Sequence, residues 1–88
     1  MKVEKMLDKL KDILSADRQT QLAKYTSLKK VLKSLRIEKK KLELELPGVI
    51  EEEAKHEIAS RLKVISMQRK KGLKVLKELK KKHKQQNE

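Results

Sequence analysis

Hydrophobic residues recur along this chain at intervals of three and four residues, which is the spacing of one helix face. The first such stretch contains Val3, Leu7, Leu10 and Leu14. Polar and charged residues occupy most of the positions between them. The pattern predicts an amphipathic helix over about residues 2–14.

Two longer apolar lines follow, and we call them together the packing seam. One line lies on a helix predicted over about residues 17–45, and the other on a helix predicted over about residues 49–83. Alternating intervals of three and four keep an apolar line facing a partner helix, as in coiled coils and bundles. The packing seam consists of Tyr25, Leu28, Leu32, Leu35, Leu42, Ile58, Leu62, Ile65, Leu76 and Leu79.

Lys39, Arg69 and Gly72 interrupt the packing seam. Long basic side chains at such positions usually extend towards solvent or fix the register of the helices. A glycine inside a helix costs about 1 kcal/mol of helix propensity, so we expect a packing reason for Gly72. Our hypothesis is that it makes room for Tyr25 on the facing helix.

The segment from residue 15 to residue 21 has no apolar side chain larger than alanine, and the phase of the apolar pattern shifts across it. Ser15 or Asp17 is a suitable N-cap for a new helix. No glycine or proline forces a break, however. Two alternatives stay open: the N-terminal stretch continues into the helix over 17–45, or it forms a short extra helix.

Residues 42–46 alternate between leucine and glutamate, as a β-strand would. A strand here needs a neighbour, and the glutamates at 51–53 make a poor return strand. Pro47-Gly48 instead predicts a turn at residues 46–48, because a residue before proline is disfavoured in a helix. A short connection between two long helices gives an antiparallel helical hairpin.

Three apolar residues, Leu44, Val49 and Ile50, flank this turn. We expect them to close an apolar plug over the bend. The glutamates that follow stand in the first turn of the next helix, where the helix dipole favours negative charge. A structural role therefore explains most of the acidic residues near the bend.

The expected fold class is all-α: a single helical domain over residues 1–88, built on a coiled-coil-like antiparallel hairpin. The polar tail at residues 84–88 is expected to fray. Each helix of a lone hairpin buries only a narrow stripe, so further packing is needed. Either the N-terminal stretch folds back as a third helix, or two hairpins pair into a dimeric four-helix bundle; we favour a homodimer.

The composition is typical of a long-helix protein, since 43% of the 88 residues are charged and Tyr25 is the only aromatic residue. The chain has no cysteine, which excludes disulfides and thiolate metal sites. No stretch has the roughly 18 consecutive apolar residues of a membrane span, and the N-terminal region lacks the apolar run of a signal peptide. We expect a cytoplasmic protein.

The formal net charge is +12, and the charge is unevenly distributed. Six acids and one lysine lie between residues 43 and 57, so the bend is acidic, whereas both legs of the hairpin are strongly basic. Basic legs attract phosphates, and such binding weakens steeply with salt. The candidate nucleic-acid-binding residues are Lys29, Lys30, Lys33, Arg36, Lys40, Arg69, Lys70, Lys71, Lys74 and Lys77.

Lysine far outnumbers arginine, and no RNA-binding motif, zinc finger or aromatic stacking platform is visible. The leading hypothesis is therefore non-sequence-specific binding of nucleic acid or ribonucleoprotein. The rival hypothesis is a coiled-coil protein-interaction module, an adaptor or scaffold, whose lysines serve solubility and steering. Binding to an anionic membrane is a third interpretation, which the absence of Trp and Phe anchors disfavours.

No catalytic arrangement is visible, because the chain lacks a nucleophile–base–acid set and a glycine-rich phosphate loop. Glu53 and His56 have the Glu-x-x-His spacing of bundle metal sites, but the seam places both on the outer side of their helix. His83 has no sequence partner that would make it a ligand or a base. We expect no enzymatic activity, cofactor, metal site or small-molecule substrate.

Overall fold

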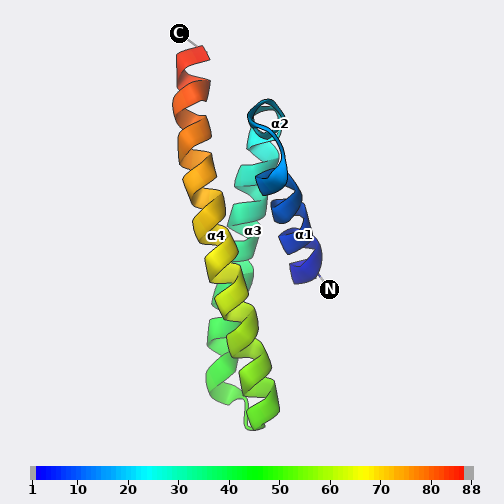
Figure 1. The fold of residues 1–88 in the computed structure, drawn as a ribbon. Coiled ribbons are helices and arrows are strands. Elements are labelled where there is room, and N and C mark those ends of the chain that lie inside the picture. Colours follow the sequence, from blue (N-terminus) through cyan, green and yellow to red (C-terminus); the bar gives the residue numbers. More distant parts are fainter. Residues whose placement is uncertain (1, 87–88) are drawn as a thin grey trace.

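The computed structural model describes the backbone of residues 2–86 and the side chains of residues 3–81. Within this range every regular element is helical, and there is no strand. The elements are α1 (Lys2–Ser15), α2 (Arg18–Ala23), α3 (Tyr25–Glu45), the 3-10 turn η1 (Leu46–Gly48) and α4 (Glu52–Gln86) (Figure 1).

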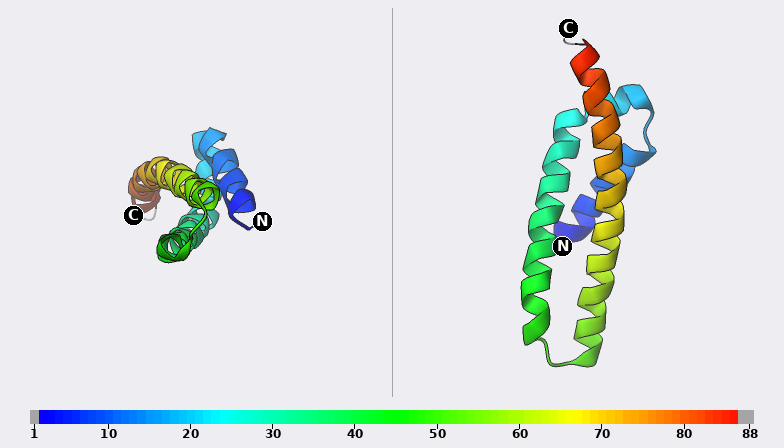
Figure 2. Two further views of the ribbon diagram at one scale, coloured as in Figure 1. Left: turned by 90° about the horizontal axis from the view of Figure 1, so that it is seen from below. Right: turned by 90° about the vertical axis from the view of Figure 1, so that its left-hand side faces the viewer.

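The two longest helices, α3 and α4, pack side by side in antiparallel directions. Helix α1 lies against both of them, in the half of the hairpin away from the bend (Figure 2). The molecule is elongated, with extents of 54 × 19 × 17 Å along its principal axes. The all-α class and the antiparallel hairpin are confirmed, and the N-terminal stretch folds back as a separate helix.

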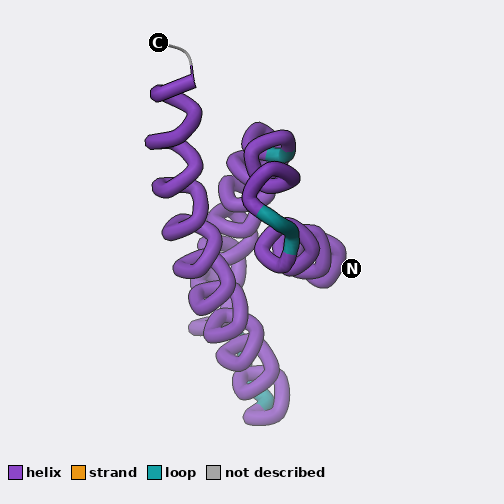
Figure 3. Tube along the Cα trace, turned by 45° about the horizontal axis from the view of Figure 1, so that its top comes forward, coloured by secondary structure: helices purple, strands orange, loops and turns teal. Residues whose placement is uncertain are grey.

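Two irregular points separate α1 from α3, and Figure 3 shows them as short teal segments. At the first, the Asp17 carboxylate accepts a hydrogen bond from the backbone N–H of Thr20 at 2.7 Å and caps α2. At the second, Lys24 has φ −100° and ψ 18°, outside the helical range. The Asp17 cap accounts for the break between α1 and α2. The helix predicted over 17–45 is also divided, at Lys24, where no side chain caps α3.

Gln21 fastens the returning α2 to the end of α1. Its side chain is 5% exposed, and its Nε2 donates to the carbonyl oxygens of Ile13 at 3.0 Å and Leu14 at 3.3 Å. Carbonyls in the last turn of a helix have no intrahelical donor. The Ile13 carbonyl also accepts from the Ala16 N–H at 3.2 Å, so Gln21 gives it a second donor and gives the Leu14 carbonyl a donor, while the Gln21 side chain is itself buried.

The core is a cluster of three helices and not a two-helix stripe. All ten residues of the packing seam are buried or half-buried. Helix α1 adds Leu10 and Ile13, which are 0% and 1% exposed. Full burial of one such side chain stabilises the fold by about 1.5–3 kcal/mol. The other buried hydrophobic residues are Leu28, Val31, Leu32 and Leu35 from α3, and Ile65 and Leu79 from α4.

Gly72 lies where α1, α3 and α4 meet. A Cβ atom at this position would be 2.6 Å from Leu32 Cδ2 and 3.1 Å from Leu10 Cδ1. The missing side chain therefore allows α1 and α3 to approach α4 closely. Our hypothesis that Gly72 makes room for Tyr25 is wrong, because a leucine of the facing helix and one of the third helix occupy this space.

The bend begins where the sequence predicts but continues further. Leu46 keeps helical angles, with φ −53° and ψ −45°, so Pro47 ends α3 by lacking an N–H and not by forcing its neighbour out of the helical region. Val49 is extended, with φ −87° and ψ 127°. Helix α4 therefore begins at Glu52 and not at residue 49.

The expected apolar plug over the bend does not form. Leu44 is 81% exposed and Ile50 is 89% exposed, while Val49 is half-buried. Two helices alone cannot enclose side chains on their outer surfaces, and α1 does not extend to the bend (Figure 1). The bend therefore exposes apolar side chains among its glutamates.

At the other end, α4 continues to Gln86, beyond its predicted end at residue 83. The helical assignment of residues 84–86 differs from the frayed tail that we expected. Residues 87 and 88, for which fraying was also expected, lie outside the described residues.

We expect Gly72→Ala to lower the free energy of unfolding by about 1 kcal/mol. The added methyl group overpacks the core at a cost of about 1–3 kcal/mol, which exceeds the gain in helix propensity of about 1 kcal/mol. Gly48→Ala is the matched control, since nothing lies within 4 Å of its Cβ position and its φ is not positive. We expect unchanged or slightly higher stability there. Urea unfolding followed by circular dichroism measures both, and equal effects would contradict the packing role of Gly72.

Hydrogen bonds from Thr20 hold the pKa of Asp17 below its ordinary value. The cap therefore stabilises the folded protein above the unfolded pKa of about 3.9, and this contribution is lost as pH falls through the lower folded value. We expect Asp17→Ala to lower the Tm near neutral pH, and to lower it progressively less as the pH falls below the unfolded pKa and through the lower folded value. Thermal unfolding of both proteins over a pH series from neutral down into the acid range tests this; a Tm difference that stays constant over the series would contradict it.

Candidate nucleic-acid interface

A groove of about 490 Å³ lies between α3 and α4, on the side of the hairpin away from α1. The right-hand panel of Figure 2 looks onto this side of the hairpin. Half of the ten candidate nucleic-acid-binding residues line the groove. Its apolar residues are Tyr25, Leu32, Leu73 and Leu76, and its polar and basic residues are Thr26, Lys29, Lys30, Lys33, Arg36 and Arg69.

The basic side chains of α3 form a line along one edge of the groove. Lys29, Lys33, Arg36 and Lys40 follow one another at intervals of four, three and four residues, so they share one face of the helix. This face is adjacent to the packing seam, which turns it towards α4. With a rise of 1.5 Å per residue, the line is about 16 Å long.

Arg69 is the basic residue that α4 contributes to the groove. Its Nε donates to the backbone carbonyl oxygen of Leu32 on α3 at 3.2 Å, and the side chain is half-buried. The hydrogen bond crosses the hairpin and therefore fixes the register of α3 against α4. Arg69 thus combines a structural contact with positive charge at the groove.

The groove also has an apolar floor. Leu73 is 44% exposed, although it lies beside the packing seam. Tyr25 is half-buried at one end, with Lys29 Nζ 5.7 Å from the centre of its ring. A cation over an aromatic ring at an exposed site is worth about 0.5–1 kcal/mol. The contact holds Lys29 beside the groove.

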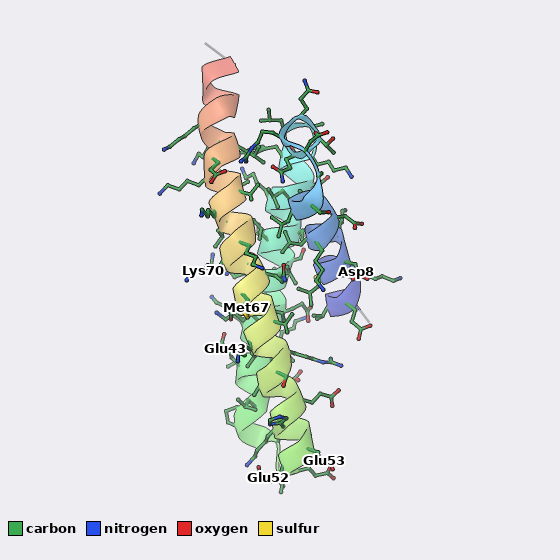
Figure 4. The ribbon with its side chains drawn as sticks, viewed as in Figure 1. Asp8, Glu43, Glu52, Glu53, Met67 and Lys70 are labelled. Atoms are coloured by element: carbon green, nitrogen blue, oxygen red, sulfur yellow. The ribbon has the colours of Figure 1, made fainter. Side chains whose placement is uncertain are left out.

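Two further candidates extend the groove side of α4. Lys70 and Lys77 are three residues before and four residues after Leu73, and so lie on the same helix face. Figure 4 shows Lys70 pointing away from α1. We call this whole side of the hairpin the groove face.

Lys71 is the candidate that the structure separates from the groove. It is seven residues before Glu78 and shares its helix face, and Glu78 Oε2 pairs with Arg18 on α2 at 2.7 Å. The Lys71 side of α4 therefore faces α2, whereas Lys74 lies between Lys70 and Lys77 at the edge of the groove face. A sequence count of lysines could not make this distinction, because it depends on where α2 packs.

The acids lie mostly away from the groove. In the described part of the chain the ion pairs are Arg18–Glu78 at 2.7 Å, Lys41–Glu38 at 3.7 Å, Lys55–Glu52 at 3.8 Å and Arg61–Glu57 at 3.4 Å. None of these pairs includes a residue that lines the groove. These four ion pairs therefore leave the positive charge of the groove residues unneutralised.

A second, more open hollow of about 860 Å³ lies beside the bend. Glu53 and His56 both line it and are exposed, as the seam predicts for their outer position. Among the described residues, no group of three or more His, Cys, Asp or Glu side chains is arranged to hold a metal ion. His83 lies outside the residues whose side chains are described.

Leu73 and Thr26 are groove residues that the sequence analysis did not assign to the site. Leu73 is four residues after Arg69, and that spacing places the two side chains on one face. This spacing can be read from the sequence. The sequence does not show which side of the hairpin stays uncovered, because that depends on the position of α1.

Comparison with protein-family models, curated proteins and solved structures finds no match to this chain. Within the described range, none of the helices is both long enough and apolar enough to pass through a bilayer. The functional assignment therefore depends on the chemistry of the groove.

We expect Arg69→Leu to lower the free energy of unfolding by about 1 kcal/mol. The substitution removes the hydrogen bond that the charged guanidinium donates, while leucine keeps the apolar contacts of the arginine methylene groups. The neighbouring substitution Lys70→Leu removes the same charge from an exposed position and should change stability by no more than about 0.5 kcal/mol. Urea unfolding compares the two variants. Equal stability of both would show that the contact with Leu32 does not stabilise the hairpin.

Proposed function

We propose that this chain is a small, non-enzymatic protein that binds the phosphate backbone of nucleic acid through the groove face. One observation supports this most strongly: five basic side chains from two helices line a single groove, and the ion pairs of the described chain include none of them. Like charges held close together repel one another. A polyanion that neutralises them, and releases its own counterions, is therefore bound favourably.

The spacing of the basic line suits a phosphate backbone. Successive cations from Lys29 to Lys40 are about 4.5–6 Å apart along the helix axis. One strand of a duplex advances about 3.4 Å per phosphate, so the line of about 16 Å spans roughly five phosphates. The long lysine side chains can adjust to the mismatch between the two intervals.

The residue types favour backbone contacts over base contacts. Lysine acts as a flexible point charge, whereas arginine is suited to bidentate contacts with guanine. Arg69 is already bonded to the carbonyl of Leu32, which leaves Arg36 as the other arginine lining the groove. We therefore propose binding with little sequence preference.

The apolar floor of the groove favours a second candidate function, the docking of an acidic amphipathic helix from another protein. Leu73, Leu76 and Tyr25 would contact the apolar side of such a helix, and the lysines would pair with its acids. This candidate corresponds to the protein-interaction module that the packing seam also suggests. We place it second because the basic residues extend beyond the apolar floor along both helices.

We expect the protein to bind short RNA and DNA, with an affinity that falls steeply as salt increases. Lys29→Ala/Lys33→Ala should weaken binding at least about tenfold at low salt and reduce the slope of log K against log[salt] by about 2, since each phosphate contact contributes about 0.9 to that slope. Fluorescence anisotropy at several salt concentrations measures both quantities. Single strands and duplexes are titrated separately.

The matched control is Lys5→Ala/Lys9→Ala, which removes two charges from exposed positions of α1, on the other side of the hairpin. It should retain nearly all of the affinity. An equal loss in both variants would show that binding depends on net charge and not on the groove face. Absence of binding at low salt would end the nucleic-acid proposal and leave the acidic helix as the candidate ligand.

A further inference from the structure

The groove face continues from the groove to the hollow beside the bend. On α4, Lys55, Ala59, Leu62, Ser66, Arg69 and Leu73 follow one another at intervals of four and three residues. Such residues share one face of a helix. The first two of them line the hollow and the last two line the groove. One surface therefore joins the two concave regions.

The charge of this surface changes sign along its length. On α3, the basic line ends at Lys40, and the next residues on the same face are Glu43 and Pro47. Figure 4 shows Glu43 on the same side of the hairpin as Lys70, away from α1. Glu52 and Glu53 line the hollow. The groove end is therefore basic and the bend end is acidic.

Both ends also expose apolar groups. Leu73 lies 44% exposed in the floor of the groove. At the bend, Leu44 and Ile50 are more than 80% exposed, and they stand among the glutamates. The bend is thus acidic and apolar, while the groove is basic and apolar.

We propose that the groove face is a self-complementary interface for a second copy of this chain, in which the acidic bend of each copy docks in the basic groove of the other. A two-fold axis brings the same patch of both subunits together. If residue i of the first copy contacts residue j of the second, then residue j of the first also contacts residue i of the second. A surface that is basic at one end and acidic at the other is complementary to its own antiparallel copy. Both bend–groove contacts then form at once.

The dimensions allow this arrangement. Along α4, Glu52 and Leu76 are about 36 Å apart, and the molecule extends 19 Å along its second principal axis. A face of these dimensions covers about 680 Å² per copy, close to the lower limit of about 600 Å² per partner for specific interfaces. We expect a dimer with a dissociation constant in the micromolar range, because the net charge of +12 on each copy opposes association.

The dimer would cover the surface to which we assign nucleic-acid binding. The bend of one copy and a phosphate backbone would compete for the same lysines, so the protein would bind nucleic acid as a monomer. The inference concerns the protein alone, and it can therefore be tested without nucleic acid and can fail independently of the proposed function.

The experiment is sedimentation equilibrium of the full chain over a concentration series, with charge-reversed variants. Glu43→Lys/Glu52→Lys makes the bend basic, and Lys29→Glu/Lys33→Glu makes the groove acidic. Each variant alone faces like charge at both contacts, and we expect dimerisation to weaken at least tenfold. In an equimolar mixture both contacts join opposite charges, so the mixture should form a heterodimer about as stable as the wild-type dimer.

Two controls change the charge equally on other surfaces. Asp8→Lys/Asp12→Lys alters α1, where Asp8 lies on the far side from Lys70 (Figure 4), and Lys5→Glu/Lys9→Glu makes the opposite change at exposed positions of the same helix. Both should dimerise like the wild type. Circular dichroism of every variant confirms that the helices are retained.

A wild-type protein that stays monomeric up to millimolar concentration would overturn the inference. So would a mixture of the two interface variants that fails to associate while both are folded, or controls that dissociate as much as the interface variants. Retention of nucleic-acid binding in any of these cases would leave the proposed function intact.

Discussion

The close approach of three helices at Gly72 is the constraint on which the rest of the structure depends. Leu32 and Leu10 occupy the space that a larger residue would need. Docking of α1 at this point buries Leu10 and Ile13 and completes a core that a two-helix hairpin could not build. It also commits α1 to one side of the hairpin, and the opposite side consequently keeps an open groove.

The position of α1 also determines how charge is distributed over the surface. Ion pairs place Glu78 beside α2 and Glu57 beside Arg61, next to the region that the N-terminal end of α1 covers. The groove receives lysines and arginines from both long helices. One face is therefore suited to a polyanion at one end and is acidic at the other. The proposed nucleic-acid binding and the proposed self-association use this face in alternation.

The fold could be predicted largely from local patterns. Apolar spacing identifies the seam residues, and Pro47 ends α3 because it lacks an N–H. The sequence left the division of the N-terminal half open. Asp17 caps α2 through a local hydrogen bond that the sequence allows, but the bond from Gln21 to Ile13 forms only when α2 returns along the end of α1. The predicted plug of Leu44 and Ile50 fails because no third helix reaches the bend. For the site, sequence spacing identifies the line from Lys29 to Lys40 but cannot assign Lys71 to the side that faces α2.

The sequence by itself determined the helical character, the place of the bend and the sign of the charge on each leg, because all three follow from neighbours within one or two helical turns. Only the tertiary structure decided which side of the hairpin is covered. That choice depends on the space at Gly72 for Leu10, a contact between residues 62 positions apart. Because covering one side leaves the other open, the same contact determines which lysines gather at the groove.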